Sequence, residues 1–183
     1  MSVATDLWAT IADEAARESA LWRAALRPES EREAVAVFSP LADDRWALGL
    51  ETIYEGYLLH YGRPRLFAPA DADAAVLLGD YLYAHGLVRV SSLGDVKVVA
   101  DLAELISLCA QIRADDAAEG DGPLWAASVA LLGTGDVRLD DARAALRDER
   151  DPVPLDELAR EVVGEAVRGA LTRHARFTKI SPR

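Results

Sequence analysis

Two carboxylates lie one helical turn apart in the apolar stretch Glu51-Thr-Ile-Tyr-Glu55, and a basic turn follows it. Residues four apart share one face of an α-helix, so Glu51 and Glu55 could hold a cation between them. A glycine and a proline end the helical pattern, and the turn after it carries Arg63 and Arg65. The pattern is typical of a site that binds a metal ion together with an anionic ligand.

The same residues also have an ordinary structural interpretation. Charged side chains are usually found on protein surfaces, so Glu51 and Glu55 could form a solvated helix face. Cations near a helix C-terminus interact favourably with the helix dipole, which would explain the two arginines without a ligand. The sequence leaves both interpretations open.

The elements that would position these residues are helices. Apolar residues recur at helical spacing over residues 5–26, 41–61, 71–88, 95–112, 123–132, 139–147 and 155–171, and a capping-box pattern predicts a further helix over 30–38. Short loops that join many amphipathic helices predict an all-α fold, a single helical bundle.

The chain is most simply organised as one all-α domain over residues 1–172, followed by a basic, mobile tail over 173–183. We expect the acidic, glycine-bearing stretch 115–122 to be an exposed loop. The helix over 41–61 is more apolar than the first one, which indicates a central position. Gly79 lies in the middle of its helix, where a glycine usually marks the close approach of another element.

Composition excludes several classes of protein. The net charge of −11 argues against a non-specific nucleic-acid binder, which needs clustered Lys and Arg. The lone cysteine, Cys109, excludes a disulfide framework and a cysteine-based zinc site. No stretch approaches the about 20 apolar residues of a membrane span, and the N-terminus lacks the pattern of a secretion signal. We therefore expect a cytoplasmic protein without a membrane span.

Further motifs follow the acid pair in a fixed order. After Glu51 and Glu55 comes the Gly-Arg-Pro turn, Asp80 follows a glycine in the next helix, and Gln111 lies near the end of the helix after that. This order and spacing resemble the trans-isoprenyl diphosphate synthases, the polyprenyl synthase family. In that family an aspartate-rich helix precedes an arginine turn, a Gly-Asp helix and a helix that ends in glutamine.

The resemblance covers about residues 45–112 and implies a truncated isoprenoid-synthase fold. It also implies a role for individual side chains. By this resemblance the Mg²⁺ ligands would be Glu51 and Glu55, the diphosphate ligands His60, Arg63, Arg65 and Gln111, and the pocket-lining residues Tyr54, Asp80 and Tyr81.

Several groups that the family's chemistry needs are missing from this chain. Thr52 stands in place of the middle aspartate, His60 and Tyr61 replace an arginine pair, and residues 124–132 contain no lysine. Ionising an allylic diphosphate requires several Mg²⁺ ions and neutralising cations. We therefore expect a non-catalytic or accessory subunit without a certain cofactor, which associates with a helical partner as a homo- or hetero-oligomer.

Two alternatives remain at this point. A divergent Mg²⁺-dependent enzyme could use Glu51 and Glu55 for the metal and bind an isoprenoid diphosphate through Arg63 and Arg65. The chain could also be a helical interaction protein unrelated to isoprenoids. A cavity between the third and fourth helices, with both glutamates pointing into it, would favour the enzyme.

Overall fold

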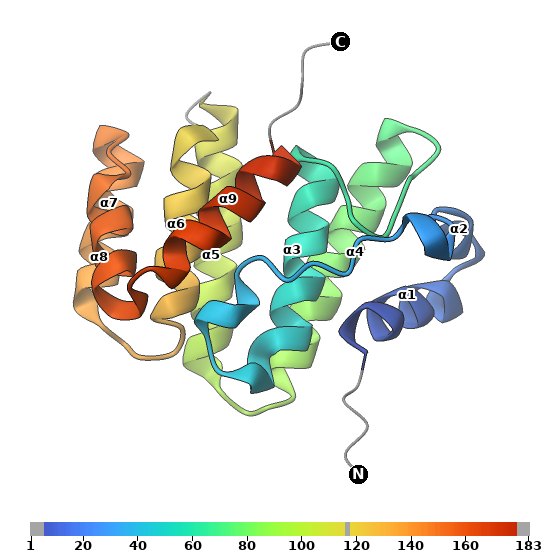
Figure 1. Cartoon of the computed structure of the whole chain (residues 1–183), viewed down its shortest axis with the longest axis horizontal. Coiled ribbons are helices and arrows are strands. Elements are labelled where there is room, and N and C mark those ends of the chain that lie inside the picture. The colour runs from blue at the N-terminus through green and yellow to red at the C-terminus, as the bar shows by residue number, and fades with distance from the viewer. Residues whose placement is uncertain (1–5, 116–117, 179–183) are drawn as a thin grey trace.

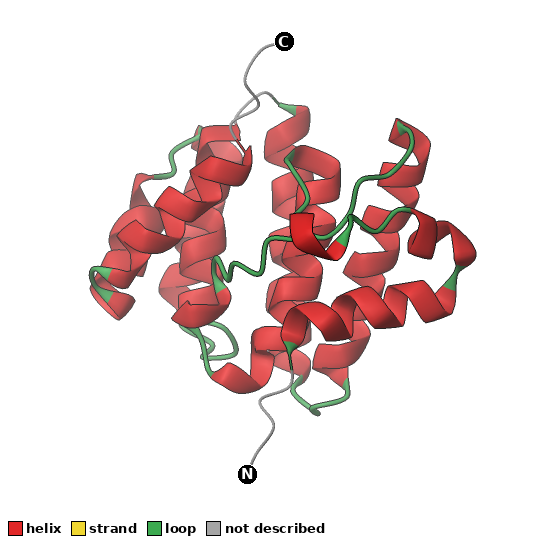
Figure 2. Ribbon diagram, turned by 45° about the vertical axis from the view of Figure 1, so that its right-hand side comes forward, coloured by secondary structure: helices red, strands yellow, loops and turns green. Residues whose placement is uncertain are grey.

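The computed structural model describes residues 6–115 and 118–178, and every regular element within these ranges is helical. Short loops join most of the helices, whereas longer connections, residues 25–46 and 62–71, precede and follow α3 (Figure 2). The α-helices are α1 (Leu7–Glu18), α2 (Ala20–Ala24), α3 (Ala47–Tyr61), α4 (Ala72–Ser91), α5 (Val96–Ala114), α6 (Asp121–Ala130), α7 (Val137–Glu149), α8 (Val153–Val163) and α9 (Ala166–Thr178). The all-α expectation is confirmed.

Helix α3 lies in the middle of the fold, with α1 and α2 on one side and α5 to α8 on the other (Figure 1). Every residue from 49 to 59 is buried, as expected for a helix that is apolar almost all round. One core cluster lies between α3 and α5 to α9, and a smaller one lies between α1, α3 and α4. The predicted central position of this helix is confirmed.

Helices α3 and α4 pack antiparallel through two glycine contacts. A Cβ on Gly56 would lie 2.9 Å from the carbonyl oxygen of Gly79, and a Cβ on Gly86 would lie 3.1 Å from that of Gly49. The two glycines of each helix are seven residues apart, so the same contact recurs after two turns. The close approach predicted at Gly79 is confirmed, and at these contacts the backbones leave no room for a cavity.

The N-terminal third differs from the predicted helices. The first helix is interrupted at Ser19, whose Oγ accepts a hydrogen bond from the backbone N–H of Leu21 (3.1 Å) and so starts a new helix. The helix predicted over 30–38 is wrong. That stretch contains only a single turn at Glu29–Glu31 and an extended segment, in which the Glu33 N–H donates to the carbonyl oxygen of Arg65.

The C-terminal third also differs from the predictions. The stretch 115–122 is not simply an exposed loop, because α6 begins at Asp121, which is buried. The single helix predicted over 155–171 is two, separated at Gly164, where φ is +61°. Helix α9 runs to Thr178 with its side chains partly in the core, so the tail predicted from 173 begins inside a helix, and residues 179–183 lie outside the described residues.

Candidate functional site

The guanidinium of Arg65 lies between the two carboxylates of the acid pair. Its Nη1 donates a hydrogen bond to Oε2 of Glu51 at 2.6 Å, and its Nε donates one to Oε2 of Glu55 at 2.9 Å. None of the three residues is more than 1% exposed. The solvated helix face is therefore wrong for Glu51 and Glu55, and the cation they share is an arginine of the same chain.

Hydrogen bonds also satisfy the remaining oxygens of this cluster. Ser39 Oγ donates to Oε1 of Glu51 at 2.5 Å, and the Leu66 backbone N–H donates to Oε1 of Glu55 at 2.7 Å. Burial alone would lower the pKa of Arg65, but the two carboxylates outweigh burial and raise it. All four carboxylate oxygens thus have donors within the chain, and a metal ion would have to displace the guanidinium.

The residues that the resemblance assigned to diphosphate have separate partners. His60 Nε2 lies 3.2 Å from Oδ1 of Asp80, and Arg63 forms an ion pair with Glu33. Gln111 is exposed on α5. Arg65 points into the core, away from the other three. The four side chains therefore do not converge on one place where an anionic ligand could bind.

The expected pocket-lining residues also lie in different places. The Tyr54 hydroxyl is 2.9 Å from Nδ1 of His174 in the larger core cluster. Tyr81 stacks on Trp22 and His85 beside the smaller cluster, with ring centroids 5.8 Å and 5.4 Å apart. Asp80 is exposed on α4. The structure does not bring these three together around one pocket.

A second buried polar cluster joins α3, α5 and α6, and the sequence analysis missed it. The Tyr57 hydroxyl and Arg113 Nε both donate to Oδ2 of Asp121, and Arg113 Nη2 donates to the Tyr57 oxygen at 2.8 Å. Burial raises the pKa of Asp121, against the hydrogen bonds from Tyr57 and Arg113, which lower it. The acidic, glycine-rich sequence around Asp121 resembles an exposed loop, so only the tertiary structure reveals this role.

His174 lies beside this cluster, at the edge of a cleft of about 330 Å³ between α5, α6 and α9. Burial, together with the positive charge of Arg113, lowers the pKa of His174 to about 3. The imidazole is therefore neutral at physiological pH, and its Nδ1 is paired with Tyr54. The sequence did not indicate a buried role for His174, because the residue lies in the segment predicted to be a tail.

The outer face of α4 carries an apolar ridge that consists of Leu77, Tyr81, Ala84 and Val88. These residues are spaced by four, three and four positions, so they lie along one face of the helix. Leu77 is 55% exposed and Val88 63% exposed, and Ala84 is also exposed. Leu77 and Val88 are thus the large exposed side chains of the ridge, while Tyr81 is half-buried against Trp22. Exposed apolar side chains on one face of a helix suit contact with another helix.

Over the described residues, no group of three or more His, Cys, Asp or Glu side chains is arranged to hold a metal ion. No helix in residues 6–115 and 118–178 is long and apolar enough to cross a membrane. Comparisons of the chain with protein-family models, with curated proteins and with solved structures found no match.

Proposed function

We propose that this chain is a non-catalytic helical protein that acts by helix–helix association, and that its first partner is a second copy of itself, bound through the apolar ridge of α4. The observation that carries the proposal is the exposure of Leu77 and Val88 on the same face of one helix. The resemblance to polyprenyl synthases remains a prediction, and the association is independent of it.

The ridge is complementary to itself in an antiparallel arrangement. If two α4 helices pair about a two-fold axis between residues 82 and 83, Leu77 of one copy faces Val88 of the other. Tyr81 then faces Ala84, so that a large side chain meets a small one, as well-packed helix interfaces require. A two-fold interface uses the same patch on both copies, which a single ridge can supply.

The size of the ridge sets the expected affinity. Fully burying a Leu or Val side chain contributes about 1.5–3 kcal/mol. Association costs roughly 4–15 kcal/mol in lost translational and rotational freedom and in ordering. Since the ridge presents only a few large side chains per copy, we expect a reversible dimer of micromolar rather than nanomolar affinity.

The buried cluster around Arg65 supports the non-catalytic part of the proposal. A magnesium-dependent prenyl transfer needs carboxylates that are free to bind the metal, whereas those of Glu51 and Glu55 are already paired with Arg65. Opening the cluster would leave charges buried without partners, which is costly. The geometry therefore favours a structural role for the acid pair over the enzyme alternative.

Sedimentation equilibrium over a range of micromolar concentrations tests the proposal. We expect the wild-type chain to show a monomer–dimer equilibrium that Leu77→Ser combined with Val88→Ser shifts to monomer. Val137→Ser is the control, because Val137 is even more exposed than Leu77 and Val88 but lies on α7. A wild-type chain that stays monomeric throughout would overturn the self-association.

A further inference from the structure

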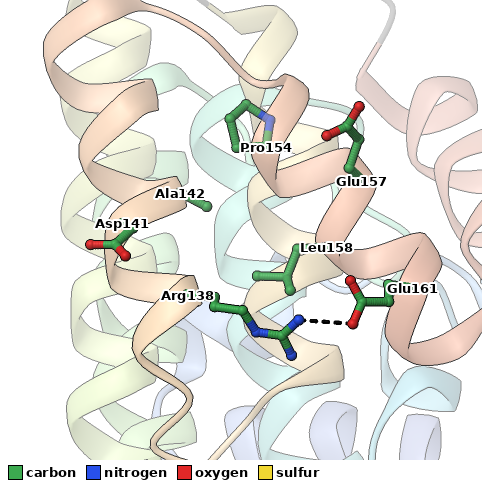
Figure 3. Close-up of a pocket in the computed structure, with 7 residues that line it drawn as sticks. All are labelled: Arg138, Asp141, Ala142, Pro154, Glu157, Leu158 and Glu161. Atoms are coloured by element: carbon green, nitrogen blue, oxygen red, sulfur yellow. Dashed lines mark hydrogen bonds and ion pairs between the residues drawn. The ribbon is translucent and has the colours of Figure 1, made fainter.

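A groove of about 400 Å³ lies between α7 and α8, at the opposite end of the bundle from α1 and α2 (Figure 1). Figure 3 shows its two kinds of lining side chain. Ala142 and Leu158 are apolar and almost completely buried, and Pro154 lies beside them. Asp141 on α7 and Glu157 on α8 lie on opposite rims. The groove therefore combines an apolar floor with acidic edges.

The negative charge of the groove is only partly neutralised. Arg138 Nη1 donates to Oε1 of Glu161 at 2.8 Å, and its Nη2 donates to Oδ2 of Asp136 at 2.7 Å. These two contacts occupy Arg138, the only cation among the described residues that line the groove. Asp141 and Glu157 are both exposed, and neither has an ion-pair partner within the described part of the chain.

The hairpin formed by α7 and α8 is also acidic and also exposes apolar side chains. Residues 136–165 contain ten Asp or Glu and five Arg, a net charge of −5 out of −11 for the whole chain. Two further apolar side chains are exposed near the helix starts, Val137 (70%) on α7 and Val153 (53%) on α8. Because α7 and α8 run antiparallel, these two valines lie toward opposite ends of the groove. Exposed apolar side chains thus lie beyond both ends of an acidic groove.

We propose that this groove docks a basic amphipathic helix of a partner protein. Such a helix would place apolar side chains along the floor at Leu158 and Lys or Arg side chains against Asp141 and Glu157. A groove between two antiparallel helices suits a helical ligand that presents anchors at i, i+3, i+4 and i+7. The charge complementarity selects a basic partner and steers its approach, and it disfavours an acidic segment as the occupant of the groove.

The test uses a labelled synthetic peptide with leucines at helical spacing flanked by lysines, and fluorescence anisotropy as the readout. We expect saturable binding that weakens as salt is added. Asp141→Lys combined with Glu157→Lys should weaken binding at least tenfold and should create binding to the same peptide with glutamates in place of lysines. Glu18→Lys combined with Glu31→Lys is the control, because it changes the net charge equally at exposed sites outside the groove.

Two results would overturn the proposal. Equal loss of binding in both double variants would show a general charge effect rather than docking in the groove. Equal binding of a scrambled peptide, with the same composition but no apolar face, would show that the floor around Leu158 takes no part. Neither result bears on the self-association through α4, because the groove lies on other helices.

Discussion

The guanidinium Nη1 of Arg65 lies 2.6 Å from Oε2 of Glu51, and both side chains are within the core. Arg65 stands only ten residues beyond Glu55, to which it also donates. The turn after α3 thus directs the arginine back onto its own helix, where it neutralises acids that would otherwise be buried alone. A buried charge without its partner is strongly destabilising, so this relationship has direct consequences for stability.

We first predict that Arg65→Met lowers the free energy of unfolding by about 3–5 kcal/mol, because it leaves two carboxylates buried without their cation. Denaturant unfolding measures the change. Arg63→Met is the control, since Arg63 pairs with Glu33 at the surface and an exposed pair is worth about 0–1 kcal/mol. Adding Glu51→Gln and Glu55→Gln to Arg65→Met should recover part of the loss. Equal losses of stability in Arg65→Met and Arg63→Met would contradict the neutralising role of Arg65 in the core.

The second prediction concerns magnesium. Titration calorimetry with Mg²⁺ and a prenyl diphosphate should give no saturable heat, because Arg65 already occupies the space between Glu51 and Glu55. A saturable heat that Glu55→Gln abolishes and Asp141→Asn leaves intact would show that the metal displaces the guanidinium. That outcome would revive the enzyme alternative.

Third, the glycine contacts between α3 and α4 should not tolerate a side chain. In Gly56→Ala the new Cβ would lie 2.9 Å from a backbone carbonyl oxygen, which cannot move aside as a side chain can. We expect a loss of about 1–3 kcal/mol from overpacking, measured by thermal or denaturant unfolding. Gly169→Ala on α9 meets only the flexible end of Arg173 at 3.3 Å, so its effect should be neutral or stabilising. Equal destabilisation by both variants would contradict the close helix contact.

The fourth prediction follows from the pKa of His174, which is lowered to about 3 in the folded chain. An unfolded histidine titrates near 6.5, so between these values the unfolded state binds the extra proton and stability falls as pH falls. The slope for one such group is about 1.4 kcal/mol per pH unit. Unfolding of the wild-type chain from pH 7 to pH 4 should show this loss.

His174→Gln is the informative comparison for that measurement. The variant should have a flatter dependence of stability on pH over the same range, even if it is less stable throughout. Asp121 changes stability in the opposite direction, since its raised pKa makes the folded state bind a proton first as pH falls. Subtracting the pH dependence of stability of His174→Gln from that of the wild-type chain removes the contribution of Asp121, which both proteins share. An unchanged slope would mean that His174 is not buried in its neutral form.

The sequence predicts the helical content and the central place of α3 because both depend on local apolar spacing. It also predicts the contact at Gly79, since a glycine inside a helix needs a packing reason. The spacing of Glu51 and Glu55 correctly places them on one face of the helix. It does not show whether that face meets water, a metal ion or Arg65, because the answer depends on how the turn after α3 folds back.

Other parts could not be predicted because tertiary packing overrides the local signal. Asp121 belongs to an acidic, glycine-bearing stretch typical of a loop. It is nevertheless buried, because Tyr57 and Arg113 donate hydrogen bonds to its carboxylate. His174 lies among basic residues typical of a tail, but the aromatic core under α9 buries it. The capping-box pattern before residue 34 does not start a helix, since the Glu33 N–H donates to the carbonyl oxygen of Arg65 instead.

The most direct test of the self-association is disulfide cross-linking between two single variants, Leu77→Cys and Val88→Cys. The only natural cysteine, Cys109, is buried and should not react. Antiparallel pairing of the α4 ridges predicts that the mixture forms a covalent dimer faster than either variant alone, and faster than a mixture of Leu77→Cys with Val137→Cys. Equal rates in the two mixtures would contradict the pairing of α4 with a second copy.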